Sequence, residues 1–499
     1  MAKGIKSLAK DTVIYGGSTI IVKFLNWLLV VLFTYTLPNP AEYGVVTNLY
    51  AWTAMLMVIL TYGMETGFFR FANKNPEDSN KVYGNALISV GSTSVIFAVF
   101  IILFNQPIAN ALSYPNHPEY IWMLGLSVAM DAFSAIPFAY LRFKNRPYMF
   151  AGLKIFYIIL YIFLNLFFLL VCPWLMKVAP GSISWFYKPD YGVGYIFVSN
   201  IITTTLQTLL LSRFIFKAKF SFDIHLLKSI WGYSLPLLIL GITGIANQNL
   251  DKMIFPHLQP GEAGKTALGI YGATSKLALV MMLFTQAFRY AYEPFVFAKQ
   301  KDKNSTQVYA DVMKYFIIFS LVIFLGMVLY LDIFKFFLPK DYWVGLSVVP
   351  IILWSYIFQG IYFNLSFWYK LIDKTIYGAW FSLVGTAIIV LGNLFFVPRF
   401  SYWGSVWAGF VCYFTIMIIS YYFGQKYMPI KYDLKTIFKY IGITVALTIL
   451  SNFIATPYIV LNIALKTILF GGFVYYTVKH DFPLSQLPFI SRLKNKIGR

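Results

Sequence analysis

The chain has 499 residues, of which 59% are hydrophobic and 12% charged, and its mean hydropathy is +0.68. A soluble domain is about half apolar and about a quarter charged, so this composition excludes a soluble protein and indicates a polytopic membrane protein. The net charge of +21 fits basic loops beside an anionic cytoplasmic leaflet and does not indicate a nucleic-acid partner. The 2 cysteines and 4 histidines are scattered without metal-ligand spacing, and no Walker motif occurs, so we expect neither a metal nor a cofactor.

Apolar windows long enough to cross a bilayer, about 20 residues each, recur along the whole chain. They predict an all-α membrane protein with about 14 transmembrane helices. Because the connectors are short, the function must reside in the helix bundle. The predicted spans are 12–36, 44–69, 82–104, 118–141, 148–172, 191–216, 230–255, 267–297, 310–331, 346–369, 376–397, 404–424, 435–454 and 457–478.

The basic residues of the loops lie mainly on one side of the predicted bundle. RFANKNPEDSNK, RFKNR and the tail SRLKNKIGR fall on this side, whereas PNPAEYG, NQPIANALSYPNHPEY and ATPY on the other side contain no lysine or arginine. The positive-inside rule then places both termini in the cytoplasm, as an even number of spans requires.

The second and eighth spans resemble each other. EYGVVTNLYAWTAMLMVILT contains Tyr43-Gly44 and ALGIYGATSKLALVMMLFTQ contains Leu268-Gly269, and both segments end in an aromatic, charged exit. The copies are six spans apart and have the same orientation, which predicts two six-helix lobes related by an axis along the membrane normal. The predicted parts are an N-terminal lobe (1–220), a C-terminal lobe (221–430) and two extra helices with a basic tail (431–499).

Four ionisable residues fall near the middle of predicted spans, namely Lys23, Asp131, Lys276 and Lys466. Such residues usually face a cavity or pair with each other, and they mark transport paths. For each, the alternative is an internal salt bridge or a long side chain that reaches the interface. Because three of the four are cations, the pattern favours an anionic ligand.

The seventh span, IWGYSLPLLILGITGIANQNLDKMIF, is interrupted by proline and glycine, which is tolerated where protein or cavity water satisfies the freed backbone groups. Asn247 and Asp251 share one helix face, and Gln248 and Lys252 share the next. The alternative for Asp251 and Lys252 is an interfacial position near the outer surface.

The eighth span carries Gln286, Arg289 and Glu293 on one stripe near its cytoplasmic end. A straight helix does not place Lys276 on this stripe, so both can face one cavity only if the span bends. Arg70 lies at the corresponding end of the second span, where a solvated helix end is the alternative.

Several blocks of the sequence resemble a known family. The opening LAKDTVIYGGSTIIVKFLNWLLVVLFTYTLPNPAEYGVVTNLYAW, then TYGMETGFFRFANK, AIPFAYLRFKNRP, and NQNLDKMIF followed by ALGIYGATSKL resemble the oligosaccharide flippases of polysaccharide biosynthesis. These belong to the multidrug/oligosaccharidyl-lipid/polysaccharide (MOP) exporter superfamily. The resemblance covers roughly the first three hundred residues, and the remainder agrees in the number of spans and the lengths of loops.

The resemblance implies two six-helix lobes around a central cavity, with two extra C-terminal helices. It also implies movement of a polyprenyl-diphosphate-linked glycan to the outer leaflet by alternating access, with the diphosphate held by Lys23, Arg70, Lys252 and Lys276. In related lipid II flippases the two extra spans make a groove for the lipid tail, which the charge of Lys466 opposes here. The candidate site residues are Lys23, Arg70, Lys252, Lys276 and Arg289 for the headgroup, Asn26, Asn247, Gln248 and Gln286 for the polar lining, and Asp131, Asp251 and Glu293 for ion coupling.

The nearest competing function is an ion-coupled multidrug exporter of the same superfamily. Such an exporter normally has twelve spans and an acidic cavity, so fourteen spans and interior lysines argue against it. A glycosyltransferase or polymerase would need larger external loops, so we expect no enzyme activity. The expected location is the bacterial cytoplasmic membrane, and the expected partners are the lipid-linked glycan and membrane lipids, with a polysaccharide polymerase or glycosyltransferases as candidate partners.

Overall fold

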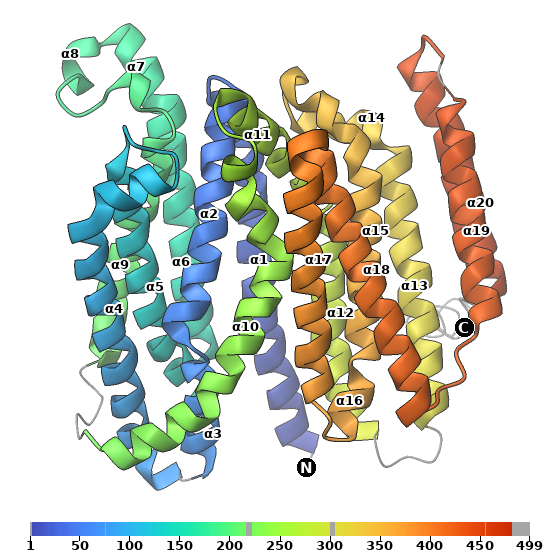
Figure 1. Ribbon diagram of the computed structural model, residues 1–499, viewed down its shortest axis with the longest axis horizontal. Helices are drawn as coiled ribbons and strands as arrows, with labels where there is room; N and C mark the ends of the chain where they lie inside the picture. Colours follow the sequence, from blue (N-terminus) through green and yellow to red (C-terminus); the bar gives the residue numbers. More distant parts are fainter. Residues whose placement is uncertain (1, 75, 216–221, 300–304, 455, 482–499) are drawn as a thin grey trace, which may run out of the picture. The chain divides into compact units, whose positions relative to one another are not determined.

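The computed structural model describes residues 2–74, 76–215, 222–299, 305–454 and 456–481 (Figure 1). These residues form helices and loops, and none of them lies in a strand. The predicted basic tail SRLKNKIGR lies outside the described residues. The all-helical membrane fold predicted from the sequence is confirmed.

The described helices include 13 that are long and apolar enough to cross a membrane, or 14 when the bent pair Glu262–Leu277 and Leu279–Glu293 counts as one span. Each coincides with a predicted span. The bent pair is the predicted eighth span, and its two helices differ in direction by 46°. The sequence required a bend there if Lys276 and the stripe around Arg289 were to face the same way, and the helix does break just after Lys276.

The helices fall into two compact units. Unit 1 comprises residues 1–276, 339–345 and 375–412, and unit 2 comprises the remainder. The units group helices by contact and not by repeat, so the lobe boundaries predicted at 220 and 430 stay predictions. The main helices of unit 1 are α1 (Ala2–Thr36), α2 (Pro40–Thr61), α3 (Met64–Lys74), α4 (Ser79–Ala111), α5 (Pro118–Phe143), α6 (Pro147–Leu166), α7 (Cys172–Val178), α8 (Pro180–Ile183), α9 (Gly194–Ile215), α10 (Ile224–Leu258), α11 (Glu262–Leu277) and α17 (Ile376–Phe400).

In unit 1, α5 packs against α2, α4 and α9, and α6 packs against α1 and α9. The long helix α10 begins after Asp223, whose side chain accepts hydrogen bonds from the backbone N–H groups of His225 and Leu226. It then crosses obliquely past α3 and α2 and leads into α11 (Figure 1). α10 also packs along α17. It therefore joins helices from distant parts of the sequence within one unit.

A sharp break separates α2 from α3 in the middle of the TYGME sequence. Tyr62 and Gly63 have φ values of +33° and +70°, in the left-handed region. A Cβ atom on Gly63 would lie 2.9 Å from the carbonyl oxygen of Ser234 in α10. Glycine is therefore needed here both for its backbone conformation and for close contact. The break lets α3 turn and pack against α10.

The main helices of unit 2 are α12 (Leu279–Lys299), α13 (Ser305–Leu329), α14 (Leu331–Phe334), α15 (Val349–Leu365), α16 (Phe367–Leu371), α19 (Leu434–Asn452) and α20 (Ile459–His480). Helix α18 (Tyr402–Tyr427) is shared between the units. α13 is the centre of unit 2, since α12, α15, α19 and α20 all pack against it. The two extra C-terminal helices predicted from the sequence thus both pack against α13.

Candidate functional site

Lys276 lies at the helix break, at the end of α11. Its backbone carbonyl accepts a hydrogen bond of 2.6 Å from the indole nitrogen of Trp27 in α1. Lys23 is four residues before Trp27 and therefore lies on the same side of α1. The first and eighth predicted spans, each of which contributes a predicted headgroup lysine, therefore meet at this point of unit 1.

Lys252 of α10 is the third member of a lysine group that also contains Lys23 and Lys276. The positive charges of Lys252 and Lys276 are close enough to repel each other. Lys252 also forms an ion pair of 3.1 Å with Asp251, and the Asp251 carboxylate accepts a hydrogen bond of 2.6 Å from the Tyr271 hydroxyl. Lys276 differs, because no acidic side chain in the described part of the chain forms an ion pair with it. The arrangement therefore leaves uncompensated positive charge where α1, α10 and α11 meet.

Asp251 is a candidate for ion coupling, and the structure places it in a closed set of contacts. Only 6% of the residue is exposed, and both carboxylate oxygens are within 3.2 Å of the Lys252 amine. With the Tyr271 hydroxyl as a further donor, the carboxylate is well satisfied. Here Asp251 stabilises the local packing of α10 and α11.

The predicted polar lining residues on α10 have different surroundings. Asn247 is buried, donates to the Ser382 carbonyl at 3.2 Å and accepts from the Thr386 hydroxyl at 2.8 Å, so it connects α10 with α17. Gln248 is exposed and donates to the Gly244 carbonyl of its own helix at 3.3 Å. Asn26 is exposed on α1. The cavity-lining role of these three residues stays a prediction.

Arg70 lies apart from the lysine group. It is exposed on α3, and its guanidinium carbon lies 4.1 Å from the ring centroid of Tyr233 in α10. Tyr233 and Lys252 are separated by roughly 28 Å of helix, at 1.5 Å per residue. The structure thus brings Lys252 and Lys276 together but not Arg70, so a headgroup held by the lysines does not reach Arg70 in this conformation.

Asp131 belongs to a second group of charges in unit 1, whose residues are half-buried. The carboxylates of Asp131 on α5 and Glu65 on α3 both act on the amine of Lys154 in α6, which lies 4.0 Å from the ring centroid of Phe138. Arg142 forms an ion pair with Glu65. Charges of opposite sign therefore compensate one another here, in contrast to the group around Lys276.

The remaining predicted site residues belong to α12 in unit 2. Glu293 forms ion pairs of 3.4 Å with Arg289 and 3.3 Å with Lys370. Arg289 also lies 5.2 Å from the ring centroid of Phe363. Gln286 lies about one turn before Arg289 on the same helix. The predicted stripe is thus a salt-bridged face, and a headgroup or ion bound there would have to compete with these pairs.

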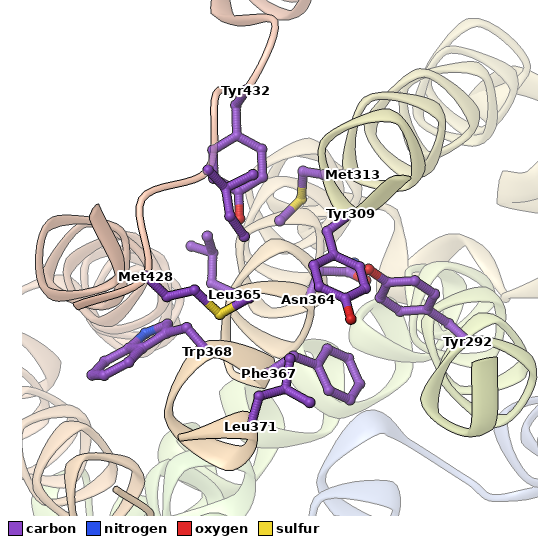
Figure 2. A pocket seen from close by; sticks show the side chains of 11 residues that line it. Tyr292, Tyr309, Met313, Asn364, Leu365, Phe367, Trp368, Leu371, Met428 and Tyr432 are labelled. Atoms are coloured by element: carbon purple, nitrogen blue, oxygen red, sulfur yellow. The ribbon is translucent and has the colours of Figure 1, made fainter. Parts of the chain in front are cut away.

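A cavity in unit 2 lies beside this stripe (Figure 2). The rings of Tyr292 and Tyr309 face it from one side and the side chains of Met428 and Trp368 from the other. None of the 11 residues that line it is charged. No pattern in the sequence indicated this cavity, and without charge it does not match the predicted anionic headgroup site.

Lys466, in the final helix, is neutralised by an acidic partner. Its amine lies 2.7 Å from the carboxylate of Asp332, which also lies 3.4 Å from Lys335. The internal salt bridge considered as an alternative from the sequence is therefore present. Lys466 thus links α20 to α14, and Tyr330, between α13 and α14, adds a hydrogen bond of 3.0 Å to Thr467.

A family model described as polysaccharide biosynthesis protein matches residues 8–291, which is more than half of the chain. The chain belongs to this family. Among curated proteins, none matches the sequence.

Solved structures share the fold at low sequence identity. The lipid II flippase MurJ in an inward closed conformation aligns with a TM-score of 0.70 at 14% identity, over 94% of this chain and 99% of MurJ. An inward-facing multidrug resistance MATE family transporter of the MOP superfamily aligns with a TM-score of 0.61 at 12% identity, over 81% and 94% of the two chains. A MOP superfamily transporter from Pyrococcus furiosus aligns with a TM-score of 0.53 at 13% identity, over 84% and 95%. The protein therefore has the fold of this superfamily.

Proposed function

We propose that the protein is a flippase that moves an anionic polyprenyl-diphosphate-linked oligosaccharide from the cytoplasmic to the outer leaflet by alternating access, for cell-surface polysaccharide biosynthesis. Membership of the polysaccharide biosynthesis family supports the substrate class. The fold shared with a flippase and with multidrug transporters supports transport and not catalysis. We place the protein in a bacterial cytoplasmic membrane with both termini in the cytoplasm, as its basic loops predict.

The observation that carries this proposal is the uncompensated charge of Lys276. A lysine near the centre of a bilayer costs about 2.5–3.5 kcal/mol on insertion scales. Lys252 and Lys466 each have a carboxylate partner, whereas Lys276 has none within the described ranges. At about 6 Å and an effective dielectric constant near 20, a phosphate charge would stabilise Lys276 by roughly 3 kcal/mol. A bound diphosphate would thus offset the cost of the buried charge.

The transported headgroup also has a physical driving force. A membrane potential that is negative inside favours outward movement of negative charge by about 2.3 kcal/mol per charge per 100 mV. The membrane potential alone can therefore drive export of an anionic headgroup, without a coupled ion. Of the three candidate coupling residues, Asp251 and Glu293 are engaged in ion pairs, which leaves Asp131 as the best placed for a coupled proton or sodium step.

The second candidate function is an ion-coupled multidrug exporter, which the fold shared with MATE transporters supports. A cationic drug would be repelled by the positive charge of Lys276, since Lys252 is already paired with Asp251. We therefore favour the anionic substrate. As partners we propose the lipid-linked glycan and a polysaccharide polymerase or glycosyltransferases.

The test is transbilayer movement of a fluorescent polyprenyl-diphosphate oligosaccharide in proteoliposomes. Wild type should move the lipid faster than protein-free liposomes. Lys276→Gln should reduce the initial rate about 100-fold at low lipid concentration, because the lost ~3 kcal/mol corresponds to two powers of ten. Lys466→Gln is the matched control, a lysine inside a span that already has a carboxylate partner, and it should move lipid at the wild-type rate. Absence of movement by wild type under every imposed potential and ion gradient would contradict the proposal.

A further inference from the structure

Two glycines from distant parts of the sequence bring the backbones of α2 and α11 into direct contact. A Cβ atom on Gly44 would collide with the carbonyl oxygen of Lys265 and would lie 3.2 Å from the amide nitrogen of Gly269. A Cβ atom on Gly269 would collide with the carbonyl oxygen of Pro40 and would lie 3.0 Å from the amide nitrogen of Gly44. Each glycine thus faces the other, and only glycine permits this separation.

The close contact continues along both helices. A Cβ atom on Gly272, about one turn further along α11, would collide with the Thr47 hydroxyl and lie 3.0 Å from the Thr47 Cβ. On the other side of α11, a Cβ atom on Gly345 would collide with the side chain of Ile270. All these residues belong to unit 1. The helices therefore meet over more than one turn without interlocking large side chains.

A buried asparagine next to these glycines links α2 to α10. The Asn48 amide donates hydrogen bonds to the carbonyl oxygens of Lys252 at 2.7 Å and Met253 at 3.1 Å. Pro256 lies four residues after Lys252 and has no N–H, so the Lys252 carbonyl lacks its usual donor within the helix. Asn48 supplies that donor from another helix, and its own oxygen accepts a hydrogen bond of 3.1 Å from Tyr114.

Gly44 and Gly269 occupy corresponding positions in the two similar segments found in the sequence. If the two segments are related by a two-fold axis along the membrane normal, corresponding residues that touch each other must lie beside that axis. Both glycines are near the helix ends predicted to face outside. Contact at the axis blocks the path at that side, and it is the place where the helices part when two lobes rotate symmetrically.

We propose that Gly44, Asn48, Gly269 and Gly272 form an outer seal of the translocation path, which must open to release the substrate. This inference rests on the proposed flippase function. Smooth glycine surfaces can separate and rejoin without rearranging side chains, whereas interlocked side chains could not. Asn48 binds the carbonyl of Lys252, a predicted headgroup residue, so the seal and the lysine group share one segment of α10.

The first test locks the seal. In a background with Cys172→Ala and Cys412→Ala, the pair Thr47→Cys and Gly272→Cys brings two thiols together, since a Cβ on residue 272 would lie 3.0 Å from the Thr47 Cβ and a disulfide needs about 3.8 Å. Oxidation should stop lipid movement in proteoliposomes, and reduction should restore it. Each single cysteine variant should be insensitive to oxidation. Undiminished movement by fully cross-linked protein would overturn the seal.

The second test does not depend on transport. A membrane-impermeant maleimide applied from outside should label Thr47→Cys slowly in the cysteine-free background, and at least about tenfold faster when Gly44→Ala or Gly269→Ala forces the helices apart. Gly152→Ala is the matched control, because a Cβ there meets nothing within 4 Å, and it should leave labelling unchanged. Equal labelling in all these variants would refute the seal even if wild type moves lipid. If wild type moves no lipid but labelling follows this pattern, the seal stands and the proposed substrate is wrong.

Discussion

Replacing Asn48 by leucine should destabilise the protein, and replacing Pro256 by alanine should reduce that loss. Leucine matches the shape of asparagine but has no amide. In the variant, the Lys252 carbonyl loses the donor that Asn48 supplies at 2.7 Å, and the Tyr114 hydroxyl loses its acceptor. Alanine at position 256 has an N–H group that can restore the intrahelical hydrogen bond to Lys252.

The expected magnitude follows from these contacts. A buried polar group left without a partner costs about 1–3 kcal/mol, whereas hydrogen bonds between membrane helices average about 0.6 kcal/mol and reach about 1.7 kcal/mol. Asn48 is 1% exposed and serves both the Lys252 carbonyl and the Tyr114 hydroxyl. We expect Asn48→Leu to lower the free energy of unfolding by about 2 kcal/mol when residue 256 is proline, and by about 1 kcal/mol when it is alanine.

The assay is a double-mutant cycle measured by reversible unfolding in mixed micelles with a denaturing detergent. The cycle removes the separate effect of Pro256→Ala on the helix, and Tyr114→Phe isolates the contribution of the hydroxyl. An equal loss from Asn48→Leu in both backgrounds would refute the reasoning, since the Lys252 carbonyl would then not be the group that needs Asn48.

Two further predictions concern ion pairing and backbone geometry. Lys466→Met should lower stability by about 1–2 kcal/mol, because it leaves the carboxylate of Asp332 with Lys335 alone. Burial raises the pKa of Asp332, but hydrogen bonds and charge from Lys466 and Lys335 lower it more, so its pKa lies below the usual value. The contribution of this pair is therefore complete above about pH 4 and lost as the pH falls through the lowered pKa. Thermal unfolding between about pH 3 and 6 should show this loss in wild type but much less in Lys466→Met, and equal pH profiles would contradict it. Gly63→Ala should lower the free energy of unfolding by about 1–2 kcal/mol because of the positive φ of +70°. Gly152→Ala, the control, should leave the free energy of unfolding nearly unchanged. Similar effects at both sites would argue against backbone strain.

Much of the fold followed from hydropathy, since each span must be about 20 apolar residues long. The predicted span 118–141 corresponds to Pro118–Phe143, and 376–397 to Ile376–Phe400. The sequence showed that a straight eighth span cannot place Lys276 on the stripe of Arg289, and the structure shows the bend of 46° that follows Lys276. The sequence did not identify which atoms hold the break, because the indole of Trp27 reaches Lys276 from 249 residues away.

The site was only partly predictable, because a residue type does not specify its partner. Asn247 and Asp251 had the polarity expected of a transport path, yet their side chains bind α17 and Lys252. Asn48 carried no such signal, since its role depends on a carbonyl freed by Pro256 in another helix. Gly44 and Gly269 marked the repeat, but only the three-dimensional structure brings them face to face.

The sign of the transported charge tests the central claim most directly. Proteoliposomes containing wild-type protein should be given, under the same membrane potential, a fluorescent polyprenyl-diphosphate oligosaccharide in one set and a cationic dye in the other. The lysine group around Lys276 predicts movement of the anionic lipid well above protein-free liposomes and none of the dye. Movement of the dye without movement of the lipid would contradict the flippase and identify a drug exporter.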